Sequence, residues 1–361
     1  MKIFVSCAAY REPELELTIA SLIENADAPQ NLHIGVVQQS TRGERVDFSQ
    51  NSHVSDIWMR AQEAKGAGYA RATAQALWDN EDFFMQIDSH TRMEPHWDTT
   101  LIDVYSSVSS ATGNERIILS QFPRSYVHEN GKDLDIVTFK YPAEPMKQVV
   151  YWAQRSLWSA LRLPFADPRM TLPEESETVL AGFIFAPGMV VTEVPYDPHI
   201  SFFGEELCFA IRAWTRGWRI YSPNHMVIKH FYQRKGHHKV WNRANNAANK
   251  WGGLEKISMD RQADVYNGVI TGMWGAPNRN VLQSYYDFIG QDVPGIYNDY
   301  LGIRELEART VTEQDMFMDG FTKAMSIPCK DEEHDKCVVN GCECECHTSP
   351  GSQNESSVSI D

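Results

Sequence analysis

The stretch Met85-Gln86-Ile87-Asp88-Ser89-His90 is an apolar run that ends in an acid and an imidazole two positions apart. The apolar part predicts a core strand, so Asp88 and His90 lie at its carboxyl end, where open α/β sheets bind ligands. Side chains at positions i and i+2 of an extended segment face the same way. One carboxylate oxygen and one imidazole nitrogen can therefore close on a divalent cation, which would serve to neutralise a diphosphate. A plain strand end followed by a polar turn is the alternative interpretation.

The segments around this stretch alternate between short apolar strands and helical patterns. Apolar side chains recur at helical spacing in residues 13–26, and a second helical pattern runs from Gly66 to about Trp78. The predicted strands of the first half are residues 3–5, 32–37, 55–59, 83–87 and 117–119. Strand–helix–strand units of this length imply an α/β protein with a Rossmann-like, mostly parallel central sheet flanked by helices.

The second half of the chain is less regular. Residues 121–180 are rich in proline and aromatic residues, and we predict an insertion there with some helix around residues 149–161. A buried strand is predicted at residues 179–186, followed by a helix from Gly204 to Trp214. Residues 240–325 are predicted to be mostly helical and to pack on the sheet as an extension.

The 361 residues have the composition of a globular protein and a formal charge of −15, which opposes general binding to polyanions. The charge is uneven, because residues 229–250 form a basic segment with several histidines nearby. This segment is interpreted either as a solvated face or as a surface that receives phosphates. No apolar window is long enough for a membrane span, and the first residues resemble a core strand rather than a signal peptide. We therefore expect a cytoplasmic protein without a membrane partner.

The last segment, residues 326–361, has a different composition that is rich in cysteine and histidine. Disulfides fit poorly in a chain without a secretion signal, whereas thiolates and imidazoles suit zinc. The spacing is not that of a standard zinc finger, so a flexible tail without a fixed metal is an equal alternative. The candidate Zn²⁺ ligands are Cys329, Cys337, Cys342, Cys344, Cys346 and His347.

Two segments before Asp88 are candidates for holding a nucleotide. The small residues that precede Tyr10 leave room for a planar base, on which Tyr10 can stack while Arg11 meets a phosphate. A strand cap with a surface arginine explains the same residues. The second segment is a helix start with two glycines, Gly66 and Gly68, whose backbone N–H groups can face an anion, and Arg71 can add a charge-assisted hydrogen bond.

Two segments after Asp88 are candidates for chemistry beside that nucleotide. Glu205 and Glu206 form an acid pair at a loop-to-helix junction, where the helix dipole favours carboxylates and capping explains at least one of them. The other can orient or deprotonate an acceptor hydroxyl. His230 ends a short predicted strand and is a candidate third ligand for the cation, although a lone histidine is more often structural.

Together these segments resemble a GT-A fold family of GlcNAc-transferases that glycosylate hydroxyl groups, including hydroxyproline, on cytoplasmic polypeptides. The resemblance covers roughly residues 1–235, apart from the middle insertion. Its most specific part is the Gln-Ile-Asp-Ser-His block with Trp97 and Asp98, combined with Gly-Glu-Glu and a later histidine. The matching segments are AAYREPELELTIASLIENA, IGVVQQ, GAGYARATAQALW, MQIDSHTRMEPHWD, LAGFIFA and VPYDPHISFFGEELCFAIRAWTRGWRIYSPNHMVIKH.

The resemblance implies a role for each matching position. Asp88 and His90 match the family's D-x-H metal motif, and His230 matches the histidine that completes the shell of a Mn²⁺ or Mg²⁺ ion. Glu205 and Glu206 match the catalytic acids near the donor sugar and the acceptor. The positions implied to surround the uridine and diphosphate are Tyr10, Arg11, Gly68, Arg71 and Asp88.

The implied architecture is a GT-A catalytic domain over residues 1–240 with an acceptor-side insertion at 121–180, a helical extension at 241–325 and the tail at 326–361. The implied activity is metal-dependent, retaining transfer of a sugar, with GlcNAc as the first choice, from a UDP-sugar to a Ser, Thr or hydroxyproline hydroxyl of an acceptor protein. Two other functions are compatible with the sequence. One is transfer to hydroxymethylated bases of DNA gripped by the basic segment, and the other is a non-catalytic nucleotide-sugar-binding module.

Overall fold

The computed structural model describes residues 1–129, 132–136, 146–153, 156–164, 173–233, 236–240 and 251–301. All of them belong to one compact unit, residues 1–310. The tail with its candidate zinc ligands lies outside the described residues, as do residues 302–325 of the expected helical extension. The division of the chain into a catalytic domain, a helical extension and a tail therefore stays a prediction.

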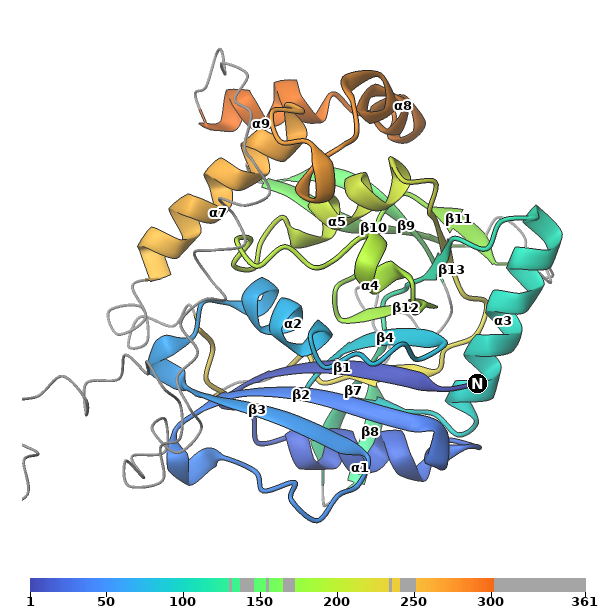
Figure 1. The fold of residues 1–361 in the computed structure, drawn as a ribbon, viewed down its shortest axis with the longest axis vertical. Helices are drawn as coiled ribbons and strands as arrows, with labels where there is room; N and C mark the ends of the chain where they lie inside the picture. Colours follow the sequence, from blue (N-terminus) through green and yellow to red (C-terminus); the bar gives the residue numbers. More distant parts are fainter. Residues whose placement is uncertain are drawn as a thin grey trace, which may run out of the picture. The chain divides into compact units, whose positions relative to one another are not determined.

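A central sheet of eight strands organises the described chain (Figure 1). Its order is β11-β13-β6-β12-β4-β1-β2-β3, and β11 and β12 run against the other strands. The predicted α/β class with a central sheet is confirmed. The strands are β1 (Ile3–Tyr10), β2 (Leu32–Ser40), β3 (Val54–Arg60), β4 (Phe83–Asp88), β6 (Ile117–Leu119), β11 (Glu174–Ser176), β12 (Phe183–Pro187) and β13 (Arg219–Ser222).

Helices cover both faces of the parallel strands, and Figure 1 shows α1 and α2 on opposite sides of them. One buried apolar cluster joins β1 to α1 (Leu15–Glu24) and α3 (Trp97–Thr112). A second cluster joins β2 and β3 to α2 (Ala67–Gln75). Successive strand residues face opposite sides, so Ala9 packs in the first cluster and Ala8 against the second. Cover on both faces explains why these strands are almost continuously apolar.

A second sheet of four strands carries the segment after Asp88. Its order is β5-β14-β7-β8. The strands are β5 (Thr91–Met93), β7 (Arg124–Glu129), β8 (Lys132–Ile136) and β14 (Ile228–His230). Because β5 begins three residues after the end of β4, this small sheet joins the central sheet at the carboxyl end of β4.

The insertion differs from its prediction. The helix expected around residues 149–161 is wrong, because β9 (Met146–Ala153) and β10 (Ser156–Pro164) pair as antiparallel strands with an irregularity between Ser159 and Leu161. Residues 149–152 are β-branched or aromatic, a composition that favours strands over helices. The buried strand expected at 179–186 is shorter than predicted, since β12 begins only at Phe183.

Helices follow the central sheet toward the carboxyl end of the described chain. They are α4 (Val190–Glu193), α5 (Glu205–Trp214), α7 (Trp251–Tyr266), α8 (Arg279–Ile289) and α9 (Val293–Leu301). The ring of Trp214 in α5 stacks on Phe288 of α8 with centroids 4.2 Å apart. Arg261 of α7 donates to the buried carboxylate of Asp197 at 2.9 Å. Among the described residues, no helix combines the length and the apolar character that a membrane crossing requires.

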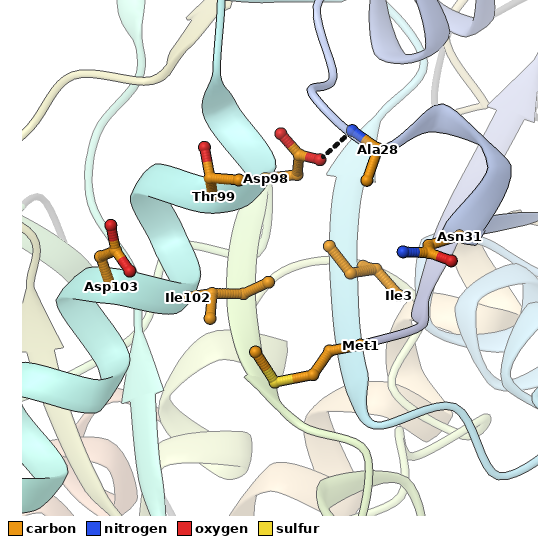
Figure 2. A pocket seen from close by; sticks show the side chains of 8 residues that line it. All are labelled: Met1, Ile3, Ala28, Asn31, Asp98, Thr99, Ile102 and Asp103. Atoms are coloured by element: carbon orange, nitrogen blue, oxygen red, sulfur yellow. Dashed lines mark hydrogen bonds between the residues drawn. The ribbon is translucent and has the colours of Figure 1, made fainter.

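Trp97 and Asp98, which belong to the most specific part of the family resemblance, have structural contacts. The indole of Trp97 is buried and donates to Leu22 O at 3.0 Å. The Asp98 carboxylate accepts from the backbone N–H groups of Asp27 and Ala28, each at 2.9 Å. Figure 2 shows Asp98 among the residues that line a pocket, together with Met1 and Ile3. That pocket lies at the amino end of β1, whereas ligands of such sheets bind at the carboxyl ends.

Candidate active site

Strand pairing brings three predicted metal ligands together at the carboxyl end of β4. Asp88 ends β4, His90 lies in the turn that follows, and β14 pairs with β5 so that His230 is in register with Thr91. His230 Nε2 lies 3.1 Å from Asp88 Oδ2, and His90 Nε2 lies 4.0 Å from the same oxygen. One ligand atom from each residue lies within 4.8 Å of the others.

This donor set fits a divalent cation. Two imidazole nitrogens and a carboxylate oxygen suit Mn²⁺ and other first-row metals. Neighbouring donors of an octahedral site with bonds of about 2.1 Å are about 3 Å apart, which is close to the separation of Asp88 and His230. The two histidines are buried, while the Asp88 side chain keeps 27% exposure. The cluster is therefore open to exchangeable ligands on the carboxylate side.

Gly182 lies against the Asp88 carboxylate, where there is no room for a side chain. A Cβ atom at this position would lie 2.9 Å from Asp88 Oδ2, the oxygen that faces both histidines. Any side chain here would push on the carboxylate. The close approach of backbone to ligand explains the glycine at this position.

Arg71 connects the metal cluster to the acid pair. Its guanidinium donates to Asp88 Oδ1 at 2.7 Å, to Glu205 Oε1 at 2.6 Å and to the Tyr196 hydroxyl at 3.1 Å. The side chain is only 4% exposed, so the fork is held between two carboxylates away from bulk water. Arg71 donates to Oδ1 of Asp88, and Oδ2 faces the two histidines. The hydrogen bond from Arg71 thus orients the carboxylate.

Electrostatics keep Asp88 ionised. Burial acts to raise the pKa of Asp88, but the hydrogen bond with His230 and the charge of Arg71 outweigh it and hold the pKa well below its usual range. Glu205 behaves differently, because burial raises its pKa even though Arg71 opposes the rise. The lowered pKa suits Asp88 to bind a cation. Glu205 has a raised pKa, and its carboxylate accepts a hydrogen bond from Arg71.

Glu206, the second predicted catalytic acid, lies one residue into α5 and is half-buried. Its Oε1 accepts from the backbone N–H of Ala181 at 2.9 Å, directly before Gly182. Gly204 before the pair has φ +83°, and a Cβ there would meet the side chain of Gln262 from α7. The Gln262 amide donates to Phe203 O at 2.8 Å, so α7 fixes the loop directly before both acids.

The segment with Tyr10 and Arg11, which was predicted to hold the nucleotide, follows the part of β1 that pairs with β4. Arg11 forms an ion pair with Glu44 and not with a residue of the metal cluster. β1 pairs with β4 so that Ala8 is opposite Asp88. Tyr10 packs with Ala64 and Val240. Arg11 has φ +47° and forms an ion pair with Glu44 at 2.6 Å. In this structure Arg11 stabilises the turn after β1, and its expected phosphate contact stays a prediction.

The glycine-rich helix start has a packing role that the sequence did not indicate. The Ala67 N–H donates to Ser201 O at 2.7 Å, whereas the contact of Gly68 with an anion stays a prediction. A Cβ on Gly66 would collide with the backbone at Ser201, and one on Gly68 with the carbonyl of Ile200. The two glycines allow α2 to lie directly against the segment that leads to Glu205.

Glu12 is a residue of the site that sequence reasoning missed. Its carboxylate is buried, with 2% of the side chain exposed, and Oε2 lies 3.1 Å from Nδ1 of His90. Oε1 lies 3.4 Å from Nδ1 of His237 and accepts from the Glu14 N–H at 3.2 Å. The only hint in the sequence was its place after the first strand, since its position depends on the left-handed turn at Arg11.

Three described residues of the basic segment, Lys229, His230 and His237, have local partners. Lys229 pairs with Asp135 at 2.9 Å and with Glu94 at 3.1 Å. His230 and His237 face the carboxylates of Asp88 and Glu12. Arg234, Lys235, Arg243 and Lys250 lie outside the described residues. Lys229 is therefore neutralised by acids rather than presented to an external phosphate.

A family model described as Glycosyltransferase (GlcNAc) matches residues 2–51 and 44–273 of the chain. No curated protein sequence matches it significantly. Among solved structures, GalNAc-T7 with UDP, GalNAc and Mn²⁺ has a TM-score of 0.53 at 14% identity, covering 84% of this chain and 56% of that one. This likeness shows a shared fold.

Two structures of TarS from S. aureus are more distant. One has a TM-score of 0.44 at 12% identity, covering 86% of this chain and 44% of that one. The other, TarS 1–349 in complex with UDP-GlcNAc, has a TM-score of 0.41 at 12% identity, covering 83% and 84%. The chain thus spans about half the length of the GalNAc-T7 and longer TarS chains.

Proposed function

Because the chain belongs to the Glycosyltransferase (GlcNAc) family, we propose that it transfers a sugar from a UDP-sugar to an acceptor hydroxyl and that the transfer depends on a divalent metal. UDP-GlcNAc is the first-choice donor, in agreement with the family description. GalNAc-T7, which shares the fold, was crystallised with UDP, a sugar and Mn²⁺.

The observation that carries the proposal is the convergence of Asp88, His90 and His230 at the carboxyl end of β4. His230 is far from the other two residues in sequence, and together the three side chains offer two imidazoles and an ionised carboxylate, a set of donors that divalent metals bind. Mn²⁺ or Mg²⁺ held there would act as a Lewis acid that stabilises the negative charge of the departing diphosphate.

The residues around this centre have separate roles in the proposal. Arg71 holds Asp88 in place and supplies a fixed positive charge. Glu205 restrains Arg71, so we assign it a positioning role rather than direct contact with the acceptor. Glu206 is the half-buried member of the pair and remains the candidate for orienting the acceptor hydroxyl. Tyr10 and Gly68 are proposed to lie near the bound nucleotide.

The acceptor is proposed to be a Ser, Thr or hydroxyproline hydroxyl of a protein, with retention of the donor's α configuration. We rank DNA lower, because Lys229 in the basic segment is paired with Glu94 and Asp135. A cytoplasmic location goes with such an acceptor and is part of the same proposal.

A panel of UDP-sugars incubated with the full chain and Mn²⁺ tests this function. We expect release of UDP, largest with UDP-GlcNAc, and loss of at least a hundredfold in rate in excess EDTA or in Asp88→Ala. Mass shifts on candidate proteins and on modified DNA identify the acceptor. Full activity in EDTA, or in a folded Asp88→Ala variant, would refute the metal role.

A further inference from the structure

Glu12 is a buried carboxylate that contacts one of the proposed metal ligands from behind. It follows β1, whose residue Ala8 lies opposite Asp88, and the left-handed Arg11 turns the chain so that residue 12 reaches the cluster. Oε2 of Glu12 lies 3.1 Å from Nδ1 of His90. The other nitrogen of that ring, Nε2, is the one that faces Asp88 Oδ2.

A carboxylate beside one imidazole nitrogen decides where the ring carries its proton. Its negative charge favours a proton on the near nitrogen, Nδ1, and this leaves the lone pair of Nε2 free for a cation. The same contact restricts rotation of the ring. Both effects prepare His90 for coordination before a metal arrives.

The two histidines of the cluster differ in their partners, and only His90 is next to Glu12. The ring of His230 packs against those of His90 and Tyr232, with centroids 4.4 and 4.1 Å away. Its Nε2 lies 3.1 Å from Asp88, a cluster member. The carboxylate partner of His90 is Glu12, which is not one of the proposed metal ligands. Glu12 can therefore keep its contact with His90 when Asp88 binds a metal.

We propose that Glu12 is a positioning residue that fixes the tautomer and orientation of His90 and thereby sets the affinity of the site for Mn²⁺. This inference rests on the metal site of the proposed function. It concerns the binding of the ion itself, so it can be tested without any sugar donor or acceptor.

The neighbouring Glu14 offers a matched control. It also carries a buried carboxylate next to a histidine, because Oε2 lies 2.8 Å from His128 Nε2 and 2.5 Å from Arg92. His128 is not part of the metal cluster. Replacement of Glu14 therefore removes a similar contact, two residues away, without touching a metal ligand.

Titration calorimetry with MnCl₂ on the full chain, with the melting temperature of each variant recorded, tests the proposal. We expect Glu12→Ala to weaken Mn²⁺ binding about 10–100-fold, the usual cost of losing such a partner. Glu12→Gln, which keeps an acceptor oxygen, should lose less, and Glu14→Ala should stay within about twofold of wild type. His237→Ala should also leave the affinity unchanged, because Glu12 acts on the metal through His90.

The outcomes separate this inference from the proposed function. If the wild type and Glu12→Ala bind Mn²⁺ equally well, the role of Glu12 is wrong and the metal site stands. Glu12→Gln replaces Glu12→Ala in this comparison if the alanine variant does not fold. Equal weakening by Glu12→Ala and Glu14→Ala would also overturn it, since the effect would then be structural. If the wild type itself fails to bind Mn²⁺ with and without UDP, the metal site of the proposed function fails.

Discussion

Gly182 shows how closely single residues surround the proposed metal ligands. A Cβ atom there would lie 2.9 Å from Asp88 Oδ2, and the glycine has no left-handed backbone that a side chain would strain. We predict that Gly182→Ala weakens Mn²⁺ binding and sugar transfer at least tenfold by displacing this oxygen, while the fold is kept. Calorimetry and UDP release measure the two effects.

The control for this substitution is Gly43→Ala, because a Cβ at Gly43 meets nothing within 4 Å. It should change neither Mn²⁺ affinity nor rate. An unaltered Mn²⁺ affinity in a folded Gly182→Ala variant would show that the Asp88 oxygen facing the histidines does not bind the metal.

At this scale the sequence could predict some of the site. Asp88 and His90 were recognisable because two polar residues at i and i+2 follow an apolar strand. The meeting of His230 with them depends on the register between β14 and β5, which no spacing in the sequence expresses. The contact of Glu12 depends on the backbone of Arg11, and arginine rarely adopts a positive φ. Arg71 was predicted to bind an anion, and its partners are protein carboxylates.

Between elements, Asp98 fixes α3 to the loop after α1. Its carboxylate accepts two backbone N–H groups and is 2% exposed, and Figure 2 shows its bond to Ala28. We predict that Asp98→Ala lowers the free energy of unfolding by about 1–3 kcal/mol, because two backbone N–H groups lose their hydrogen bonds to a charged acceptor. Urea denaturation measures this loss.

Asp103 lines the same pocket and is exposed, so Asp103→Ala is the matched control and should stay within about 0.5 kcal/mol of wild type. Mn²⁺ affinity should be unchanged in both variants. A fall in Mn²⁺ affinity in Asp98→Ala without loss of stability would mean that the Trp97-Asp98 block serves the site rather than the fold.

The loop before α5 is tied to α7 by the buried pair Asp197 and Arg261. Burial acts to raise the pKa of Asp197, but His199 and Arg261 lower it below its ordinary value. Its contribution to stability is therefore complete above the unfolded pKa, about 3.9, and is lost as the pH falls through the lower folded value. Asp197→Asn should be less stable than wild type at pH 7, and the difference should shrink below about pH 4.

Urea denaturation of both proteins between pH 7 and pH 2.5 checks this pH dependence. Glu44, whose pKa is lowered to about 2 mainly by its bond to Arg11, titrates in both proteins, so its effect cancels in the difference. A difference in unfolding free energy that stays constant over the whole range would contradict an ionised Asp197 in the folded state.

Elements were predictable where one physical pattern dominated. Residues 3–5, 32–37, 55–59 and 83–87 lie within β1, β2, β3 and β4, since buried parallel strands are continuous apolar runs. The helix expected around residues 149–161 was wrong, because this segment has no strong periodicity and forms strands β9 and β10. For short apolar runs the β-branched and aromatic content is the better guide.

At the scale of the whole molecule, the α/β architecture and the family were predictable from the order of the segments along residues 1–235. Beyond that match the sequence predicted helices, and α7, α8 and α9 lie there, but it did not predict their contacts. Helix α7 contributes Gln262 and Arg261 to the loops around the acid pair, a role for which the sequence had no pattern. The net charge of −15 opposed polyanion binding, and the pairing of Lys229 with Glu94 and Asp135 points the same way.

The most direct test of the account is pulsed EPR of the full chain loaded with Mn²⁺ in the presence of UDP, which detects nitrogen nuclei bonded to the ion. Coordination by His90 and His230 predicts coupling to two imidazole nitrogens, with one lost in His90→Ala, the other lost in His230→Ala and no bound Mn²⁺ in Asp88→Ala. A bound Mn²⁺ ion whose spectrum lacks imidazole coupling, or keeps it unchanged in these variants, would contradict the proposed metal centre.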